Sequence, residues 1–336
     1  MTSITHTSPQ TNACITHNYC GIDLVKFLCT FLVIAIHFHP FSPAHFQSAD
    51  TLNFVFSQVL ARVAVPFFFI ATGFFLLGTD DVDRVLRHSM KILRIYAAWT
   101  MLLILGSHSH LWYLRGTVVG VLGVSLCLRR MKFPQVVLLA LVLYAIGLLG
   151  DSYYGFLEPL RSFGPLDTLV YAYELRFQST RNGIFMGFPF ILMGAWFARS
   201  GFTMKTARAA LGLGFSLALM VVEAMVLQKL ELSKDHNMFL LLLPAAFFLF
   251  ALSLSLKLEP RPVYVHLRSI GALNYYAHIM VAKIVAILFE ILTKLTNISL
   301  SPYLFPAITA ASLLTVTGIY RLSRHEKFTW IQYLYR

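Results

Sequence analysis

Charged residues are scarce in this sequence, and acidic residues are the scarcer kind. Of 336 residues only 12% are charged, with 15 acidic against 27 basic, whereas 57% are hydrophobic. The mean hydropathy is +0.69. A water-soluble fold of this length could not bury so much apolar surface behind so few charges. The composition therefore excludes a soluble globular protein and predicts an all-α polytopic membrane protein.

The sequence also lacks the features of a cleaved secretory signal. The first nineteen residues are polar without a cationic stretch, and the first apolar segment is followed by "HFHPFSPAH", in which no cleavage site is evident. We therefore expect a retained first helix. Neither a soluble domain nor a low-complexity tract is evident, and no extracytoplasmic esterase-like domain is expected after the last apolar segment.

Long apolar runs are what the sequence has in abundance. Runs of 17 to 25 residues bounded by charge, Pro or Gly have the length that crosses a bilayer as a helix. They predict a bundle of about ten transmembrane helices, at residues 20–39, 52–78, 89–107, 111–128, 134–150, 182–199, 207–228, 237–256, 270–293 and 303–321.

Basic residues alternate between the connections in a way that orients this bundle. Connections on one side, together with the C-terminal segment, carry 17 of the 27 Lys and Arg residues, and those on the other carry 7. Lys26, Arg62 and Lys283 fall inside spans. Because basic residues concentrate on the cytoplasmic side, both termini are predicted to be cytoplasmic and the chain to lie in the plasma (inner) membrane.

The net charge of +12 is then explained by basic residues that set the topology and attract anionic membrane lipids. Nucleic acid is not an expected partner. The four cysteines, Cys14, Cys20, Cys29 and Cys127, fall in the cytoplasmic half of this arrangement. No disulfide is expected there.

This topology divides the chain into a cytoplasmic tail at 1–19, a membrane domain at 20–321 and a second cytoplasmic tail at 322–336. The longest connection, 151–181, is extracytoplasmic and rich in aromatic and charged residues. Connections of that length are commonly functional. Its aromatic content favours a lid over a disordered spacer.

A polar stripe interrupts the first span, "GIDLVKFLCTFLVIAIHFHPF". Lys26 and His37 are eleven residues apart, so on a helix they share a face and lie roughly 16 Å apart along the axis. Asp23 and Thr30 fall on the same stripe. Lipid cannot satisfy such groups, so the stripe must face the bundle interior or a wet cavity.

Two interpretations of the stripe stay open. Lys26 could reach the cytoplasmic interface and pair with Asp23, or both could line a channel. His37, near the outer boundary, is a candidate general base. His39 lies 200° around the helix and is the poorer candidate.

Several segments resemble the membrane acyltransferase family 3. The resemblance rests on a Lys and a His eleven residues apart in the first span, on "ARVAVPFFFIATGFFLL" in the second, and on "HLWYL" at 110–114, "RNGIFMGFPFILMGAW" at 181–196 and "NYYAHIM" at 274–280. Their order over the whole chain makes the resemblance specific. Thr72 departs from the serine that the family commonly has before Gly73.

The resemblance implies an acyltransferase whose essential histidine is His37. Arg62, in the middle of the second span, would bind an anionic group or stabilise negative charge in the transition state. The alternative is a structural ion pair, with Glu223 or Glu290 as candidates. Pro66, four residues on, is expected to kink this helix around a cavity.

The segment "DRVLRHSMKILR" resembles the paired-arginine motif of family members that acetylate sugars. Its basic residues, Arg84, Arg87, Lys91 and Arg94, would bind the phosphates of acyl-CoA. Which pair is the counterpart stays open, and charge that only sets topology is the alternative.

The remaining candidates are polar or aromatic residues of the expected channel. Arg181 opens the matching segment at 181–196, Thr72 precedes Gly73 in the one at 61–77, and His278 is either a cavity residue or a satisfied buried histidine. His108, His110 and Trp112 cluster at the outer face. No acid or cysteine joins the two histidines at ligand spacing, so no metal is expected.

Together these features predict an integral membrane O-acyltransferase of the cell envelope. It would move an acyl group, in particular acetyl, from cytoplasmic acyl-CoA to a hydroxyl of an extracytoplasmic glycan or lipid-linked precursor. Acyl-CoA is a donor substrate here, and no bound cofactor is expected. His37 would act as general base or would carry the acyl group itself.

A transporter is the rival interpretation. The first two spans also resemble the membrane half of vancomycin-resistance serine racemases, which is linked to amino-acid uptake. In that case Arg62 would bind the carboxylate of serine or another small anionic solute. A scaffold without chemistry is a third possibility, against which the buried charges argue.

Overall fold

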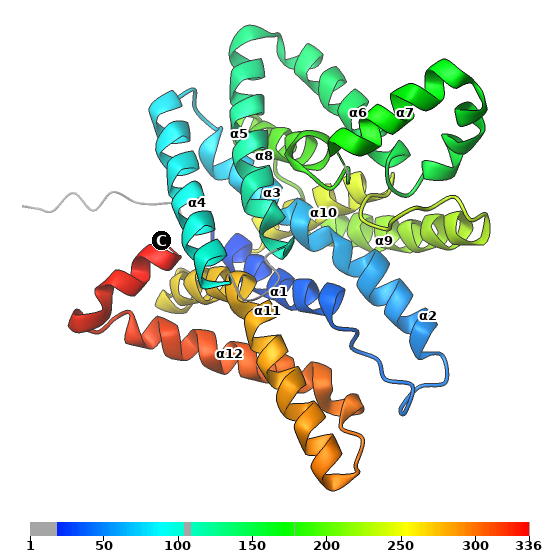
Figure 1. Ribbon diagram of the computed structural model, residues 1–336. Coiled ribbons are helices and arrows are strands. Elements are labelled where there is room, and N and C mark those ends of the chain that lie inside the picture. The colour runs from blue at the N-terminus through cyan, green and yellow to red at the C-terminus, as the bar shows by residue number, and fades with distance from the viewer. Residues whose placement is uncertain (1–18, 104–108, 178, 336) are drawn as a thin grey trace, which may run out of the picture.

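The computed structural model describes residues 19–103, 109–177 and 179–335, and these ranges form helices without any β-strand (Figure 1). The longer helices, which form the body of the molecule, are α1 (Cys20–His37), α3 (Ala64–Leu76), α4 (Val82–Leu102), α5 (Trp112–Arg130), α6 (Phe133–Leu149), α7 (Gly164–Phe177), α8 (Phe188–Ser200), α9 (Thr206–Lys229), α10 (Leu242–Ser255), α11 (Pro262–Thr296) and α12 (Leu304–Leu322).

Short helical turns complete the chain. A helix α2 (Ala49–Asn53), a π-helical turn η1 (Phe54–Val59) and a 3-10 turn η2 (Leu60–Val63) lead directly into α3. A second π turn, η6 (Gly183–Gly187), leads into α8. The other 3-10 turns are η3 (Ser109–Leu111), η4 (Tyr154–Phe156), η5 (Glu158–Ser162), η7 (Ser301–Tyr303) and η8 (Glu326–Leu334).

Five helical runs within the described ranges are long and apolar enough to cross a membrane. They are Cys20–His37, Ala49–Leu76, Gly183–Ser200, Thr206–Lys229 and Ser301–Leu322. Two shorter apolar helices are Phe133–Leu149 and Leu242–Ser255. The all-helical membrane class is therefore confirmed, while the total of ten spans and the cytoplasmic position of both termini stay predictions.

Several of the expected limits differ from the structure. The helix expected from residue 89 begins at Val82. The span expected at 52–78 is one helical run from Ala49, and it tightens to 3-10 geometry at Arg62. Pro66 has no N–H to offer the Arg62 carbonyl, which removes one α-helical bond there. The span expected at 237–256 becomes helical only at Leu242, and α11 begins at Pro262, before the expected 270.

Helix α1 lies inside the molecule, where α3, α10 and α11 pack around it (Figure 1). Helices α3 and α8 approach closely because each contributes a glycine. A Cβ at Gly73 would lie 2.0 Å from the Ile191 carbonyl oxygen, and one at Gly194 would lie 2.0 Å from that of Ile70. Small residues at such crossings are typical of membrane helices.

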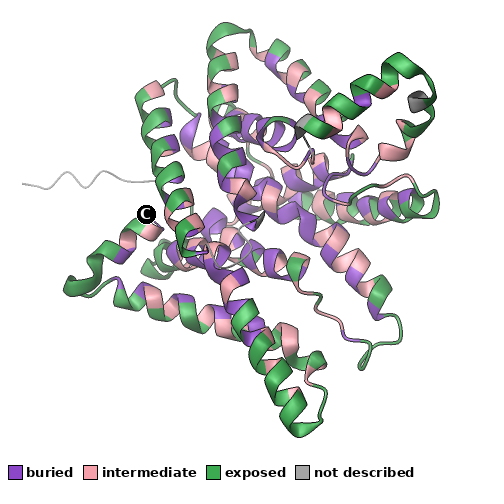
Figure 2. Cartoon of the chain, in the orientation of Figure 1, coloured by how far each residue is buried: buried purple, intermediate pink, exposed green. Residues whose placement is uncertain are grey.

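Buried residues gather in the middle of the molecule, and exposed ones cover the outer faces of the peripheral helices (Figure 2). The exposed faces are themselves apolar. Helix α9 presents Leu211 and Phe215, and α11 presents Ile287 and Leu295. Apolar surface of this extent fits contact with lipid.

The connection expected at 151–181 is folded. It contains η4, η5 and α7, and it contacts the segment between α9 and α10. The Tyr154 hydroxyl donates to Glu174 at 2.6 Å, and Lys234 donates to the same carboxylate at 2.9 Å. These bonds fasten the long connection to itself and to the segment between α9 and α10.

Candidate functional site

One cavity lies beside the Lys26 and Thr30 part of the polar stripe. It has a volume of about 160 Å³ and is lined by Lys26 and Thr30 of α1, by Phe68 and Tyr113, and by Arg268 and Tyr275 of α11. The stripe therefore faces the protein interior, as expected from the cost of polar groups in lipid.

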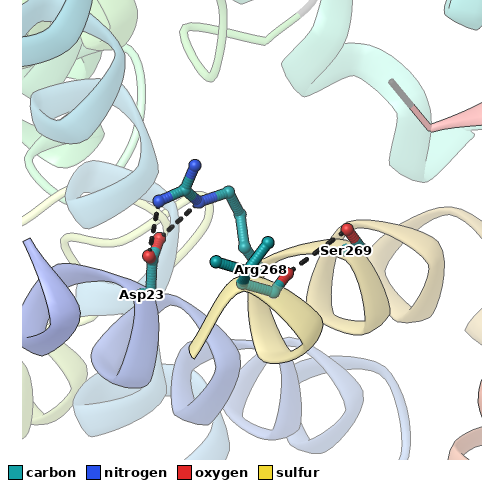
Figure 3. Close-up of polar contacts among 4 residues, drawn as sticks. Asp23, Arg268 and Ser269 are labelled. Atoms are coloured by element: carbon teal, nitrogen blue, oxygen red, sulfur yellow. Dashed lines mark hydrogen bonds and ion pairs between the residues drawn. The ribbon is translucent and has the colours of Figure 1, made fainter. Parts of the chain in front are cut away.

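Asp23 does not pair with Lys26. Its carboxylate accepts two hydrogen bonds from Arg268 of α11, from Nε at 2.8 Å and from a terminal nitrogen at 2.6 Å (Figure 3). Asp23 is buried, so this bidentate pair supplies the partner that its charge requires. The Lys26 ammonium instead lies 5.1 Å from the centre of the Phe75 ring. Of the two interpretations left open from the sequence, the pairing of Asp23 with Lys26 is therefore wrong.

Thr30 and Thr72 link helices around this cavity. The Thr30 hydroxyl donates to the Phe27 carbonyl and accepts from the Asn274 side chain at 3.0 Å. The Thr72 hydroxyl donates to the Phe68 carbonyl and lies 3.5 Å from the Tyr113 hydroxyl. Thr30 thus lines the cavity, whereas Thr72 lies behind one of its walls.

A second cavity collects most of the other predicted residues. It is small, about 30 Å³, and its lining includes His37, Arg62, His110, Trp112 and Arg181, together with Asn237 and Tyr275. Tyr275 lines both this cavity and the one beside Lys26. His37 also lines a third, wider cavity of about 380 Å³ formed with the 38–43 segment and Phe305.

His37 is exposed at the end of α1 and lines both the small and the wide cavity. Its ring centre is 5.5 Å from that of His278, which is fully buried on α11. His110 also lies beside His278, with 5.2 Å between the ring centres. Three histidines from distant parts of the chain thus form one cluster.

The hydrogen bonds of His278 determine its tautomer. Its Nδ1 lies 2.9 Å from the Tyr275 carbonyl oxygen and 3.2 Å from that of Asn274. A carbonyl only accepts, so Nδ1 carries the hydrogen and neutral His278 has its lone pair on Nε2. That nitrogen is buried without a partner among the described residues.

His110 is held in a comparable way. Its Nε2 lies 3.2 Å from the Tyr276 carbonyl oxygen, and the Tyr275 hydroxyl donates to the His110 carbonyl at 2.7 Å. Since the Tyr276 carbonyl also only accepts, Nε2 is the protonated nitrogen. These two bonds attach the 109–111 turn to α11 and fix the ring beside His278.

Arg62 has neither of the acidic partners considered from the sequence. It donates to the Asn237 side-chain oxygen at 2.7 Å and to Gln58. Glu223 instead accepts from the Tyr153 hydroxyl and from two backbone N–H groups, and Glu290 pairs with Lys294. The alternative of an ion pair with Glu223 or Glu290 is therefore wrong.

Arg181 shares the Asn237 side-chain oxygen with Arg62. It donates to Asn237 at 3.2 Å, and its guanidinium lies 5.3 Å from the centre of the Trp112 ring. The neighbouring Asn182 caps η6 by accepting from two backbone N–H groups, which places Arg181 at the start of that turn.

Asp151 fixes Asn237. The Asn237 side-chain amide donates to Asp151 at 2.9 Å, and the backbone N–H groups of Asn237 and Met238 donate to it as well. Burial raises the pKa of the Asp151 carboxyl, and these hydrogen bonds oppose that rise. Asp151 and Asn237 were not found from the sequence, because their only signal was a position at span boundaries.

The basic cluster on α4 is exposed. Arg84 donates to the Phe75 carbonyl at 2.8 Å, and the ring of Phe75 lies beside Lys26. Arg84 thus lies near the cavity that Lys26 lines. Arg87, Lys91 and Arg94 extend from it along the exposed face of α4.

His108 lies outside the described residues. Within the described ranges, His, Cys, Asp and Glu form no group of three that could hold a metal ion. The cluster therefore offers two oriented buried imidazoles, one exposed imidazole and two guanidinium groups around a small cavity.

A comparison with protein families finds a match to the acyltransferase domain of acyltransferase family 3 over residues 20–321. No solved structure matches significantly.

Curated relatives include two proteins named amino-acid racemase from Enterococcus faecalis. They are 29% identical over 71% of this chain and 30% identical over 84% of it. A serine/alanine racemase from Enterococcus gallinarum is 27% identical over 77%. The matches cover 36%, 43% and 40% of these relatives, so the chain spans less than half of their length.

Proposed function

The chain belongs to the acyltransferase 3 family, and from that premise we propose that it transfers an acyl group, in particular acetyl, from cytoplasmic acyl-CoA to an extracytoplasmic hydroxyl. The observation that carries this proposal is the position of His37. It lines both the small cavity and the wide one, so a single imidazole can reach both a donor and an acceptor.

The acyl group would approach along α1. The phosphates of acyl-CoA would bind the exposed basic face of α4, and the thioester would enter the cavity beside Lys26. Tyr275 separates this cavity from the one at His37. Passage past Tyr275 would bring the thioester carbonyl to His37.

His37 would accept the proton of the acceptor hydroxyl as its oxygen attacks the thioester carbonyl. The new C–O bond forms and the C–S bond breaks, and the leaving coenzyme A thiolate takes up the proton that His37 accepted. Arg62 would stabilise the negative oxygen of the tetrahedral intermediate. An acyl group carried on His37 itself is the alternative route.

The acceptor would be a glycan of the cell envelope or its lipid-linked precursor, in the plasma (inner) membrane. Anionic lipids would contact the basic side of the molecule.

Transport of serine or a similar small anionic solute is the second candidate. It is favoured by the racemase relatives, one of which is named for serine and alanine, and by the guanidinium pair at the small cavity. Arg62 would then bind the carboxylate of the solute.

An experiment in proteoliposomes would distinguish acyl transfer from transport. Labelled acetyl-CoA is supplied on the basic side and candidate acceptors on the other side. Label in the acceptor is the expected result. Uptake of labelled serine without any acylated product would favour the transporter and contradict acyl transfer.

A further inference from the structure

Two arginines share one neutral oxygen in the small cavity. Arg62 donates to Asn237 Oδ1 at 2.7 Å and Arg181 at 3.2 Å. Arginines that meet inside a protein normally share a carboxylate, because each buried charge needs an opposite one. An amide oxygen supplies a hydrogen bond without supplying that charge.

Neither guanidinium forms an ion pair in the part of the chain that the structure describes. Asp151, which contacts Asn237, is occupied by four hydrogen bonds from Asn237, Met238 and Ser152. Asp235 and Asp151 attract Arg62 without touching it. Asn237 therefore holds the two guanidinium groups together. The nearby carboxylates compensate the positive charges only in part.

Donor capacity is also left over. Arg62 is 8% exposed, and its Nε is buried without a hydrogen-bond partner in the described ranges. The Arg181 guanidinium donates one hydrogen bond, to Asn237, and lies over the Trp112 ring. A guanidinium presents five N–H donors in a planar fork that fits oxyanions.

The shape of the cavities limits what could be bound. The small cavity, about 30 Å³, admits a compact group, and it shares the lining residue His37 with the wide cavity of about 380 Å³. A ligand could place a small charged head between the arginines while its body lies in the wider space.

We propose that Arg62 and Arg181 form an oxyanion site that binds a carboxylate or phosphate carried by the acceptor. The guanidinium N–H groups that Asn237 Oδ1 does not accept from would donate to the oxygens of this group. An acceptor held there has its hydroxyl directed to His37. The assignment to the acceptor rests on the proposed acyl transfer, whereas oxyanion binding itself does not.

Binding is tested on the purified full chain in detergent at constant ionic strength. The probes are sodium acetate, inorganic phosphate and methyl glucuronide, with methyl glucoside as the neutral match. A rise in the thermal unfolding midpoint with an anionic probe, and none with the glucoside, is expected because a ligand of the native state stabilises it.

Variants assign the site. Arg181→Gln should weaken the apparent affinity for the anionic probe by about tenfold to a hundredfold, the loss of one or two charge-assisted bonds. Arg181→Lys should lose less. Arg115→Gln removes an exposed arginine stacked on Tyr96 outside the small cavity, and it should bind like the parent.

The proposal is overturned if no anionic probe shifts the midpoint, or if Arg181→Gln binds as well as Arg115→Gln does. If Arg181→Gln does not fold, the midpoint shifts with glucuronide and with glucoside are compared in the parent and in Arg181→Lys. Equal shifts with the two sugars in the parent would then overturn the proposal. A response to phosphate alone would assign the site to phosphate, and one to acetate and glucuronide alone to carboxylate.

Acyl transfer gives a separate result. With acetyl-CoA as donor, the glucuronide should be acylated more efficiently than the glucoside, and the preference should fall in Arg181→Gln. Anion binding without any acylation would contradict the proposed function but leave the oxyanion site in place. Acylation of glucuronide and glucoside with equal efficiency would support acyl transfer and overturn the assignment of the oxyanion site to the acceptor.

Discussion

His37 is accessible, and two buried histidines lie behind it. Backbone carbonyls fix the protonated nitrogens of His278 and His110, so the neighbours of His37 have defined tautomers. His37 itself has no hydrogen-bond partner among the described residues and faces two cavities. These properties suit a group that must take up a proton from a substrate.

Replacement of His37 by Ala or Gln should lower acyl transfer by about 10² to 10⁴, because both remove the base. His39→Ala should remain active, since His39 lines the wide cavity without lining the small one. The measurement is transfer of label from acetyl-CoA, with yield and unfolding midpoint as controls for folding.

A structural role for His37 would give a different pattern. Gln keeps similar reach and hydrogen-bonding capacity, so it would restore activity if the imidazole only maintained the fold. Substantial transfer by well-folded His37→Ala would remove His37 as the base.

Helix α4 is the element that carries the exposed charge. Asp81 caps its first turn, and its basic residues lie on the exposed face while Val85 and Ile92 are buried on the other. Arg84 contacts the end of α3 beside the cavity of Lys26. A donor with several phosphates could therefore bind along α4 while its thioester reaches that cavity.

Neutralising Arg84, Arg87, Lys91 and Arg94 to Gln should raise KM for acyl-CoA more than it lowers kcat, because these contacts are remote from the reacting bond. Steady-state kinetics in proteoliposomes would measure both. The matched control neutralises Arg129, Arg130 and Lys132, which are also exposed and basic. Equal effects of the two sets, or an unchanged donor KM, would remove α4 as the donor site.

At the scale of the molecule, the site lies between the two ends of the bundle. Helices α2 and α7 lie toward the right of Figure 1, and the C-terminus lies at the left. The cavity of Lys26 and the wide cavity of His37 each share one lining residue with the small cavity, Tyr275 and His37 respectively. Such a series could bring a donor and an acceptor together from opposite sides of a membrane.

The positive-inside rule gives this arrangement a direction. Single cysteines at His45→Cys and Pro165→Cys, both exposed positions, should react with an impermeant thiol reagent in intact cells. Arg130→Cys should react only after the membrane is opened. Labelling of position 130 with protection of position 165 in intact cells would reverse the orientation.

The sequence by itself determined the membrane class, because hydropathy and charge spacing are properties of consecutive residues. It also placed His37 and Lys26 on one helix face, since helical periodicity is local. The sequence did not determine the hydrogen-bond partners of the buried charged residues. Arg268, the partner of Asp23, is 245 residues away, and Asn237, which joins Arg62 to Arg181, is 175 residues from Arg62. Only the packing of α1 against α11, and of the 237–241 segment over η2, decided those contacts, because side chains so far apart in sequence meet only where helices cross. The meeting of His37, His278 and His110 is likewise a tertiary property, fixed by carbonyls on α11 that no spacing along the chain reveals.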